Sequence, residues 1–141
     1  GAIRLRSDIE RKRLAGLDAL SRSGSGVGEQ LYAADATRHT YGHLARLAGV
    51  ILDAGWPVIA DATFTARWQR DLLREQARAR GVAFRILDFQ VPVATLRERI
   101  LERARKGSDA SEANLDVLRH QIETEEPLAA DETADSVPIG A

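Results

Sequence analysis

The stretch Trp-Pro-Val-Ile-Ala-Asp at positions 56–61 constrains the fold of this chain more than any other part of its sequence. Its three central residues form a continuous apolar run that ends at Asp61, a pattern typical of a strand buried on both faces. Helical patterns flank it, over 35–54 and over 65–80. Strands separated by helices of this length run parallel with right-handed crossovers. The sequence therefore predicts an α/β fold with three α/β/α layers around a mainly parallel, doubly wound sheet.

The other expected elements follow from periodicity and from residues that begin or end helices. Ser7 and Glu10 have the spacing of a capping box, and Gly55 and Gly81 are expected to end helices. The segment 18–30 is rich in Ser and Gly and is expected to be a flexible loop. The remaining strands are expected at 2–7, 82–89 and 136–140, and the remaining helices at 8–15, from Pro92 to about 105, and at 111–124.

Length and composition limit the class of protein. A chain of 141 residues suits one domain, and 44% hydrophobic with 29% charged residues suits a globular fold. The net charge of −1 supplies no field for a nucleic-acid polymer or a membrane surface, so neither is expected as a partner. The absence of cysteine excludes disulfides and thiolate metal sites. With no membrane-span pattern and no signal-peptide core, the expected location is cytoplasmic.

Polar residues stand where three of the expected strands end. Asp8 follows the first strand, Asp61 and Thr63 follow the second, and Asp88 and Gln90 follow the third. Ligands of open parallel sheets bind at the carboxyl ends of the strands. Carboxylates that converge on one such edge are suited to a cation that is itself bound to phosphate. The sequence therefore predicts a metal-phosphate site at this edge.

Several segments together resemble a known family. They are RSDIERKRLAG near the start, VIADATF in the middle, and RERILER, SDASEANLDVLRHQ and EEPL further on. In this order and spacing they resemble the P-loop kinase-like ATP-binding proteins, which include the zeta-toxin, gluconate-kinase and polynucleotide-kinase types. The similarity extends from about Arg4 to Pro127. It is strongest to the ATP-binding half of bacterial proteins in which such a domain is fused behind an aminoglycoside-phosphotransferase-like domain.

The resemblance gives roles to residues at the expected sheet edge. It implies that Asp8 is the catalytic base for the acceptor hydroxyl, that Arg11 holds the substrate, and that Asp61 holds magnesium through water. The residues alone favour a helix N-cap role for Asp8, and they suit Arg11 equally to a solvated position on the helix.

A second set of roles concerns a lid. The resemblance implies that 97–112 forms a lid whose arginines contact the nucleotide phosphates. Because Arg99 and Arg103 lie four residues apart among glutamates, they also suit a solvated helix face with ion pairs. The candidate nucleotide-binding residues are Arg99, Arg103 and Arg119.

One departure from the family is large. Its phosphate loop, GxxxxGK[ST], does not occur in the sequence, and SGSGVGEQ is no substitute because it contains no lysine and follows a helix. The chain opens on what resembles the family's second strand. The family's first strand would lie between the strands at 56–61 and 82–89, which would otherwise lack a neighbour. We therefore expect 1–141 to be a fragment of one P-loop kinase-like domain, completed by an upstream segment, with a fused domain there, or by a strand-swapped oligomer.

Two functions follow from these expectations. The first is an ATP- and Mg²⁺-dependent phosphotransferase, or its ATP-binding domain, acting on a small hydroxyl-bearing substrate. The second is a non-catalytic α/β module that resembles a degenerate P-loop protein and serves binding or scaffolding. Without the phosphate loop, the isolated fragment is expected to have little or no kinase activity. The segment 128–141 is expected to be an acidic tail that includes the last strand.

Overall fold

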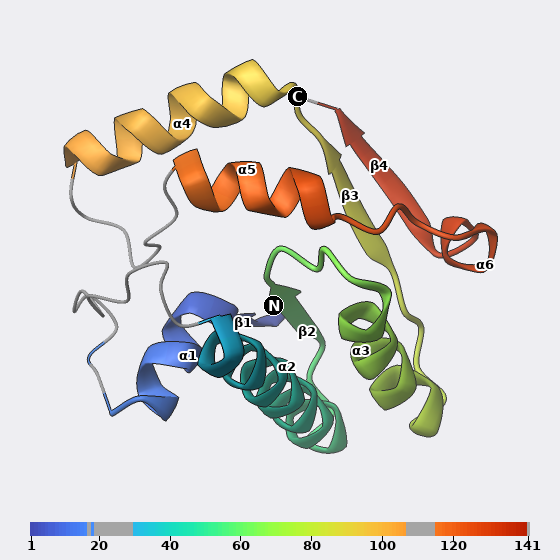
Figure 1. Cartoon of the computed structure of the whole chain (residues 1–141). Helices are drawn as coiled ribbons and strands as arrows, with labels where there is room; N and C mark the ends of the chain where they lie inside the picture. Colours follow the sequence, from blue (N-terminus) through green and yellow to red (C-terminus); the bar gives the residue numbers. More distant parts are fainter. Residues whose placement is uncertain (17, 19–29, 107–114, 141) are drawn as a thin grey trace.

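The computed structural model describes residues 1–16, 18, 30–106 and 115–140. Helices separate the four short strands along most of the chain, as the sequence predicts (Figure 1). In chain order they are β1 (Ile3–Arg6), α1 (Ser7–Leu14), α2 (Gln30–Asp53), β2 (Val58–Asp61), α3 (Arg67–Ala79), β3 (Ile86–Gln90), α4 (Val93–Lys106), α5 (Leu115–Thr124), α6 (Ala130–Thr133) and β4 (Ser136–Gly140).

The strands form two parallel pairs. β1 pairs with β2 in a register that sets Ile3 beside Val58 and Arg6 beside Asp61, and β3 pairs with β4 in a register that sets Ile86 beside Ser136. The predicted mixture of helices and parallel strands is therefore present. The single doubly wound sheet in three layers is not confirmed, because the described strands make two sheets of two strands each.

The break between the sheets falls between β2 and β3. Neither strand pairs with the other, so within the described residues each of the two has one strand neighbour. Parallel strands must lie about 4.8 Å apart to exchange backbone hydrogen bonds. The inner edges of β2 and β3 therefore meet no described strand. The resemblance places the family's first strand between these two edges.

The core lies between the first sheet and the helices packed on it. Leu5 of β1 meets the apolar stripe of α2, and Leu73 of α3 closes the cluster. Leu44, at the centre of that stripe, is fully buried. Figure 1 shows α2 and α3 side by side next to β2. The full set of buried residues in this cluster is Leu5, Tyr41, Leu44, Ala45, Ala48 and Leu73.

Glycines end two helices as the sequence predicts. Gly55 has φ +81° just after α2, and Gly81 has φ +64° just after α3. Both values lie in the left-handed region, where a residue without a Cβ is favoured, so the chain turns away from the helix axis there. The predicted capping box at the start of α1 is wrong. The N-cap residue is Arg6, without a side-chain cap bond, and Glu10 is buried in other contacts.

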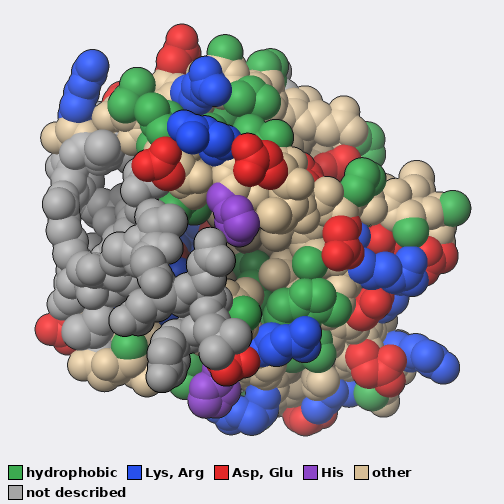
Figure 2. Space-filling model, viewed as in Figure 1, with side chains coloured by type: hydrophobic (Ala, Val, Ile, Leu, Met, Phe, Trp, Pro, Cys, Tyr) green, Lys and Arg blue, Asp and Glu red, His purple; other side chains and the backbone are tan. Residues whose placement is uncertain are grey.

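The second sheet is less covered than the first. Its residues alternate, so that Asp88 shares a face with Ser136 while Leu87, Phe89 and Val137 share the other. Phe89 is 65% exposed, and Leu87 and Val137 are also exposed. Figure 2 shows basic and acidic side chains interspersed over the face in view. No helix of the described residues is both long and apolar enough to cross a bilayer.

Candidate functional site

Asp8 and Asp61 lie at the carboxyl ends of neighbouring parallel strands. Asp61 is the last residue of β2 and is set beside Arg6, the last residue of β1. Asp8 follows two positions later, as the second residue of α1. Because parallel strands end at the same edge of a sheet, the topology brings the two carboxylates to one edge.

Each carboxylate is held by an arginine of β1. Arg6 reaches Asp8 with two nitrogens, Nε to Oδ1 at 3.1 Å and Nη2 to Oδ2 at 2.6 Å. Arg4 donates to Oδ2 of Asp61 from Nε at 3.0 Å and also from Nη2. The two arginines are two residues apart on one strand and therefore share a face of the sheet. The positive charges at this edge come from the same strand that leads into Asp8.

The two ion pairs differ in their exposure to solvent. The side chains of Arg4 and Asp61 are 59% and 43% exposed, and such a pair contributes only about 0–1 kcal/mol. Those of Arg6 and Asp8 are 27% and 18% exposed. Asp8 Oδ1 also accepts a hydrogen bond from the backbone N–H of Ile9 at 2.9 Å. The pair of Asp61 is therefore the weaker of the two, whereas Asp8 is held by a less exposed pair and by a backbone hydrogen bond.

An aromatic group stands beside the end of β2, and the sequence did not single it out. The hydroxyl of Tyr41 lies 3.3 Å from Oγ1 of Thr63 and accepts from the backbone N–H of Phe64 at 3.3 Å. Its ring meets those of Phe64 and Trp68 edge to face, with centroids 5.4 and 5.6 Å apart. The sequence predicts a helix over 35–54 that includes Tyr41, but a helical pattern cannot show what the hydroxyl of Tyr41 binds.

Phe64 adopts a strained backbone in this turn. Its φ of +48° is in the left-handed region, which is unusual for a non-glycine residue. Surrounding contacts must hold such a residue, since the conformation costs on the order of 1–3 kcal/mol. The bond from its N–H to Tyr41 is one of those contacts.

A second contact that the sequence missed joins α1 to α2. Nε2 of His43 lies 3.3 Å from Oε2 of Glu10, and Nη1 of Arg13 donates to Oε1 of the same carboxylate at 2.6 Å. Arg46 lies 3.0 Å from Nδ1 of His43. Glu10 is only 4% exposed. These contacts fix α1, and with it Asp8, against α2.

The arginine predicted to hold the substrate lies on α1, and those predicted to contact the nucleotide phosphates lie on α4 and α5. Arg11 is exposed on α1, and Arg99 is exposed on α4. Arg119 is exposed on α5 and pairs with Asp116 at 3.4 Å. Arg103 belongs to α4, but its side chain lies outside the described residues. Figure 1 shows α4 and α5 next to one another at the end of β3 opposite α3. These arginines remain predictions, because no described contact joins them to Asp8 or Asp61.

Two predicted segments fall partly outside the described residues. Residues 19–29 of the expected loop at 18–30 lie outside the described residues, and Gln30 already belongs to α2. Of the lid at 97–112, residues 97–106 belong to α4 and the rest lie outside the description. The expected tail at 128–141 contains α6 and β4, and β4 has the bounds expected for the last strand.

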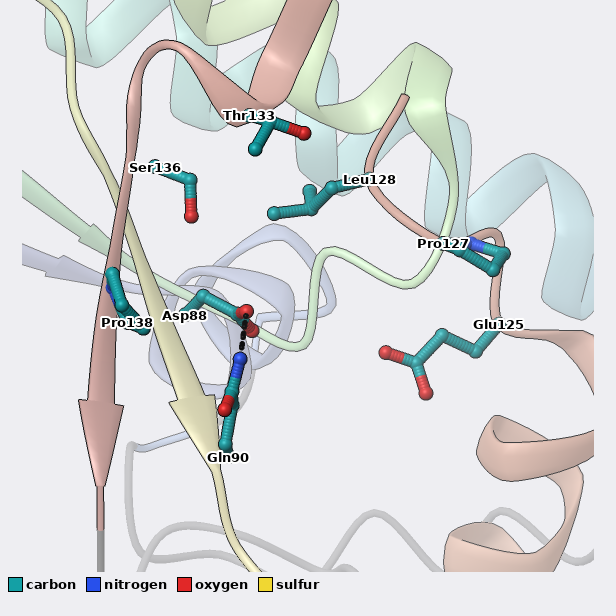
Figure 3. A pocket seen from close by; sticks show the side chains of 8 residues that line it. All are labelled: Asp88, Gln90, Glu125, Pro127, Leu128, Thr133, Ser136 and Pro138. Atoms are coloured by element: carbon teal, nitrogen blue, oxygen red, sulfur yellow. Dashed lines mark hydrogen bonds between the residues drawn. The ribbon is translucent and has the colours of Figure 1, made fainter. Parts of the chain in front are cut away.

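A cavity of about 430 Å³ opens beside the second sheet (Figure 3). Asp88 and Gln90 line it from within β3, so they do not follow that strand as the sequence predicts. Nε2 of Gln90 donates to Oδ2 of Asp88 at 3.2 Å. Its wall contains two carboxylates and no basic side chain, a composition that repels phosphate. The residues that line it are Asp88, Gln90, Glu125, Pro127, Leu128, Thr133, Ser136 and Pro138.

A family model described as AAA domain matches residues 1–128. The chain belongs to the AAA domain family. This membership supports a P-loop NTPase-like α/β fold and nucleotide binding at a coarse level, since the family includes kinases such as gluconate kinase and polynucleotide kinase. No curated protein matches the chain closely enough to count as a relative.

The residues of this AAA domain fit magnesium and ATP only in part. Asp61 offers the carboxylate oxygen that a hard cation prefers, in a pair weak enough to open. The described residues contain no group of three or more acidic or histidine side chains placed to bind a metal. The lysines of the sequence are Lys12, which is buried in α1, and Lys106, so neither follows a strand as a phosphate-loop lysine must. The sequence thus contains carboxylates at the end of β2 and the start of α1 but no GxxxxGK[ST] phosphate loop.

Proposed function

We propose that this AAA domain is part of an ATP-dependent phosphotransferase that acts on a small hydroxyl-bearing substrate. The observation that carries the proposal is the parallel register of β1 and β2, because it sets Asp8 and Asp61 at one sheet edge. Membership of a nucleotide-binding family supports it. The likeness to the ATP-binding half of fusion proteins that also contain an aminoglycoside-phosphotransferase-like domain belongs to the same proposal.

Asp8 is the proposed base. In phosphoryl transfer the acceptor oxygen forms a bond to phosphorus while the bond to the leaving ADP oxygen breaks, and the hydroxyl proton must go to a base. The Asp8 carboxylate would accept that proton, held in place by Arg6. A positioned base contributes roughly 10²–10⁴ in rate. Arg11, exposed one turn further along α1, is the proposed contact for an anionic part of the substrate.

Asp61 is the proposed magnesium carboxylate. Bound Mg²⁺ would neutralise charge on the phosphates, as it does in phosphoryl transfer generally. Asp61 would hold the cation by exchanging its contact with Arg4, and Arg4 would then be free to face the phosphates. Arg99, Arg103 and Arg119 are proposed to contact the nucleotide phosphates from α4 and α5.

The unpaired edges of β2 and β3 support a further part of this proposal. Two strands whose inner edges pair with no strand of the described residues are suited to receive a third strand between them. A strand leading into a phosphate loop would supply the phosphate cradle that this sequence lacks. It would come from a segment outside these residues, because strand exchange with a second copy could supply a strand but not a phosphate loop.

The test uses a protein that contains this domain together with a phosphate-loop segment. Calorimetry with ATP and Mg²⁺ measures binding, and a coupled assay measures ADP release with candidate hydroxyl-bearing acceptors. Asp8→Asn should lower turnover by about 10²–10⁴ and leave nucleotide affinity nearly unchanged. Asp61→Asn should remove the dependence of ATP affinity on Mg²⁺.

Glu75→Gln is the matched control. Glu75 is an exposed carboxylate of α3 whose contact with Arg78 is 3.9 Å long, and its loss should change neither property. Asp8→Asn with full turnover would contradict the assigned role. The 141-residue chain alone should show little or no turnover, so measurable turnover from it would contradict the proposed need for a phosphate loop.

One observation favours the alternative, a non-catalytic binding or scaffolding module. Both carboxylates already form ion pairs within the chain, so their role could be structural. In that case the protein binds no ATP, and Asp8→Asn and Asp61→Asn change only the free energy of unfolding. Calorimetry with ATP and Mg²⁺ separates the two functions.

A further inference from the structure

A buried ion pair joins α3 to α6. Nε of Arg70 donates to Oε1 of Glu132 at 2.6 Å, and Nη2 donates to Oε2 at 3.0 Å. The side chains are only 5% and 0% exposed. Burial of two charges is costly and is offset only when geometry is good and further hydrogen bonds satisfy the remaining atoms. The two-point contact meets the first condition.

The second condition is met by two backbone groups. Nη1 of Arg70 donates to the carbonyl oxygen of Phe64 at 2.9 Å, and Oε2 of Glu132 accepts from the N–H of Ala129 at 3.0 Å. Phe64 is the residue with φ +48° in the turn after β2, and Ala129 is the N-cap of α6, which leads into β4. Arg70 and Glu132 thus connect the carboxyl end of β2 to the segment that precedes β4.

Other arginines of α3 form more exposed ion pairs with acidic residues in α6 and just after it. Arg67 reaches both oxygens of Asp131, at 3.0 and 2.7 Å, and Arg74 reaches Asp131 at 3.2 Å and Asp135 at 3.3 Å. Each such pair contributes only about 0–1 kcal/mol. Among these ion pairs, the Arg70–Glu132 pair is the one whose two side chains are both buried.

Backbone bonds reinforce the same connection. The N–H of Glu126 donates to the carbonyl oxygen of Thr65 at 2.7 Å, and the N–H of Arg67 donates to Oε2 of Glu126 at 2.7 Å. The segment before α6 is therefore also attached to the turn after β2.

The strand topology shows what this connection does. α3 packs on the first sheet through Leu73, whereas β4, just after α6, belongs to the second sheet. No described strand pairing joins the two sheets. We propose that the Arg70–Glu132 pair is a positioning clamp, which fixes the spacing of β2 and β3 and the conformation of the Phe64 turn. This inference does not depend on whether the domain binds a nucleotide.

The absence of cysteine makes the spacing measurable by spin labelling. Gly42→Cys on α2 and Leu87→Cys on β3 place one nitroxide on each side of the break between the two sheets, and both positions are exposed. Double electron–electron resonance on the 141-residue chain should give one narrow distance distribution. Glu132→Gln should at least double its width, because it removes a charge and leaves Arg70 buried without its partner.

Asp53→Asn is the matched control. Asp53 binds Arg80 through two bonds of 2.7 and 2.8 Å, but that pair joins α2 to α3 on one side of the break. The control should leave the width unchanged. A broad distribution in the parent chain, or an equal broadening in the control, would overturn the proposal.

A second variant covers the case in which Glu132→Gln fails to fold. Replacing the pair by Arg70→Met with Glu132→Leu should preserve folding, because apolar replacement of a buried pair is often neutral or stabilising. The Phe64 carbonyl still loses its donor in this variant. The clamp therefore predicts a folded chain with a widened distribution, whereas a return to the parent width would mean that the pair only fills space.

Discussion

Gly49 allows the packing of α2 on α3 to be tested by a single methyl group. A Cβ at this position would lie 2.6 Å from Oε1 of Gln76 and 2.8 Å from Nη2 of Arg80, both on or next to α3. Gly42, in the same helix, has nothing within 4 Å of its would-be Cβ. The two glycines therefore share a helical backbone and differ in what surrounds them.

The magnitude follows from two opposing effects. Alanine is better than glycine in a helix interior by about 1 kcal/mol, and Gly42→Ala should gain this in full. Gly49→Ala should gain the same stability from helix propensity. It should lose about as much, because Arg80 must give up its hydrogen bond to Gln76 and its ion pair with Asp53. The obstacles are the ends of flexible side chains, which can move. Gly49→Ala should therefore be nearly neutral, and the two variants should differ by about 1 kcal/mol.

Urea denaturation followed by tryptophan fluorescence measures the difference. If Gly49→Ala stabilises the chain as much as Gly42→Ala, α3 does not approach α2 as the structure shows. A double variant sharpens the test. In an Arg80→Ala background the obstacle is smaller, so Gly49→Ala should recover part of the missing stabilisation, and an unchanged difference would mean that Arg80 is not the obstacle.

Two further properties can be measured in the same way. Leu44→Ala should lower the free energy of unfolding by about 2–5 kcal/mol, because Leu44 is fully buried and its loss leaves a cavity; a loss below 1 kcal/mol in the urea midpoint analysis would contradict this. Acid should also weaken the clamp, since its hydrogen bonds from Arg70 lower the pKa of Glu132 from the ordinary value of 4.5. That stabilisation is fully present above the unfolded pKa and is lost as the pH falls through the lower, folded pKa. Urea midpoints measured from about pH 6 to 2 should therefore fall less steeply in Glu132→Gln than in the parent chain, and equal slopes would show that Glu132 does not contribute.

Features that depend on local pattern could be predicted from the sequence. The apolar stripe of α2 and the glycine at 55 bounded one helix, and the run Val58–Ala60 with Asp61 bounded a strand, because periodicity and backbone freedom act over a few residues. α6 was missed, since a helix of four residues has no stripe. The capping box at Ser7 failed because burial of Glu10 against His43 outweighed a local hydrogen bond.

The candidate site, too, could be predicted from the sequence only in part. That Asp8 and Asp61 follow strands could be read from the chain, and parallel order then placed them at one edge. The partners of these carboxylates could not be read, because Arg4 and Arg6 reach them only once β1 and β2 pair in register. The hydroxyl contact of Tyr41 with the turn after β2 is equally invisible in a pattern of apolar residues.

The sequence by itself determined the order of the strands and of the helices other than α6, and the parallel direction of the strands, because these depend on spacing along the chain. Only the tertiary structure decided that the strands form two pairs, and that Arg70 meets Glu132 across 62 positions of sequence. Such a contact brings together two charges that are each unfavourable to bury alone, and their burial is tolerated only when the fold aligns both. No local pattern encodes that alignment.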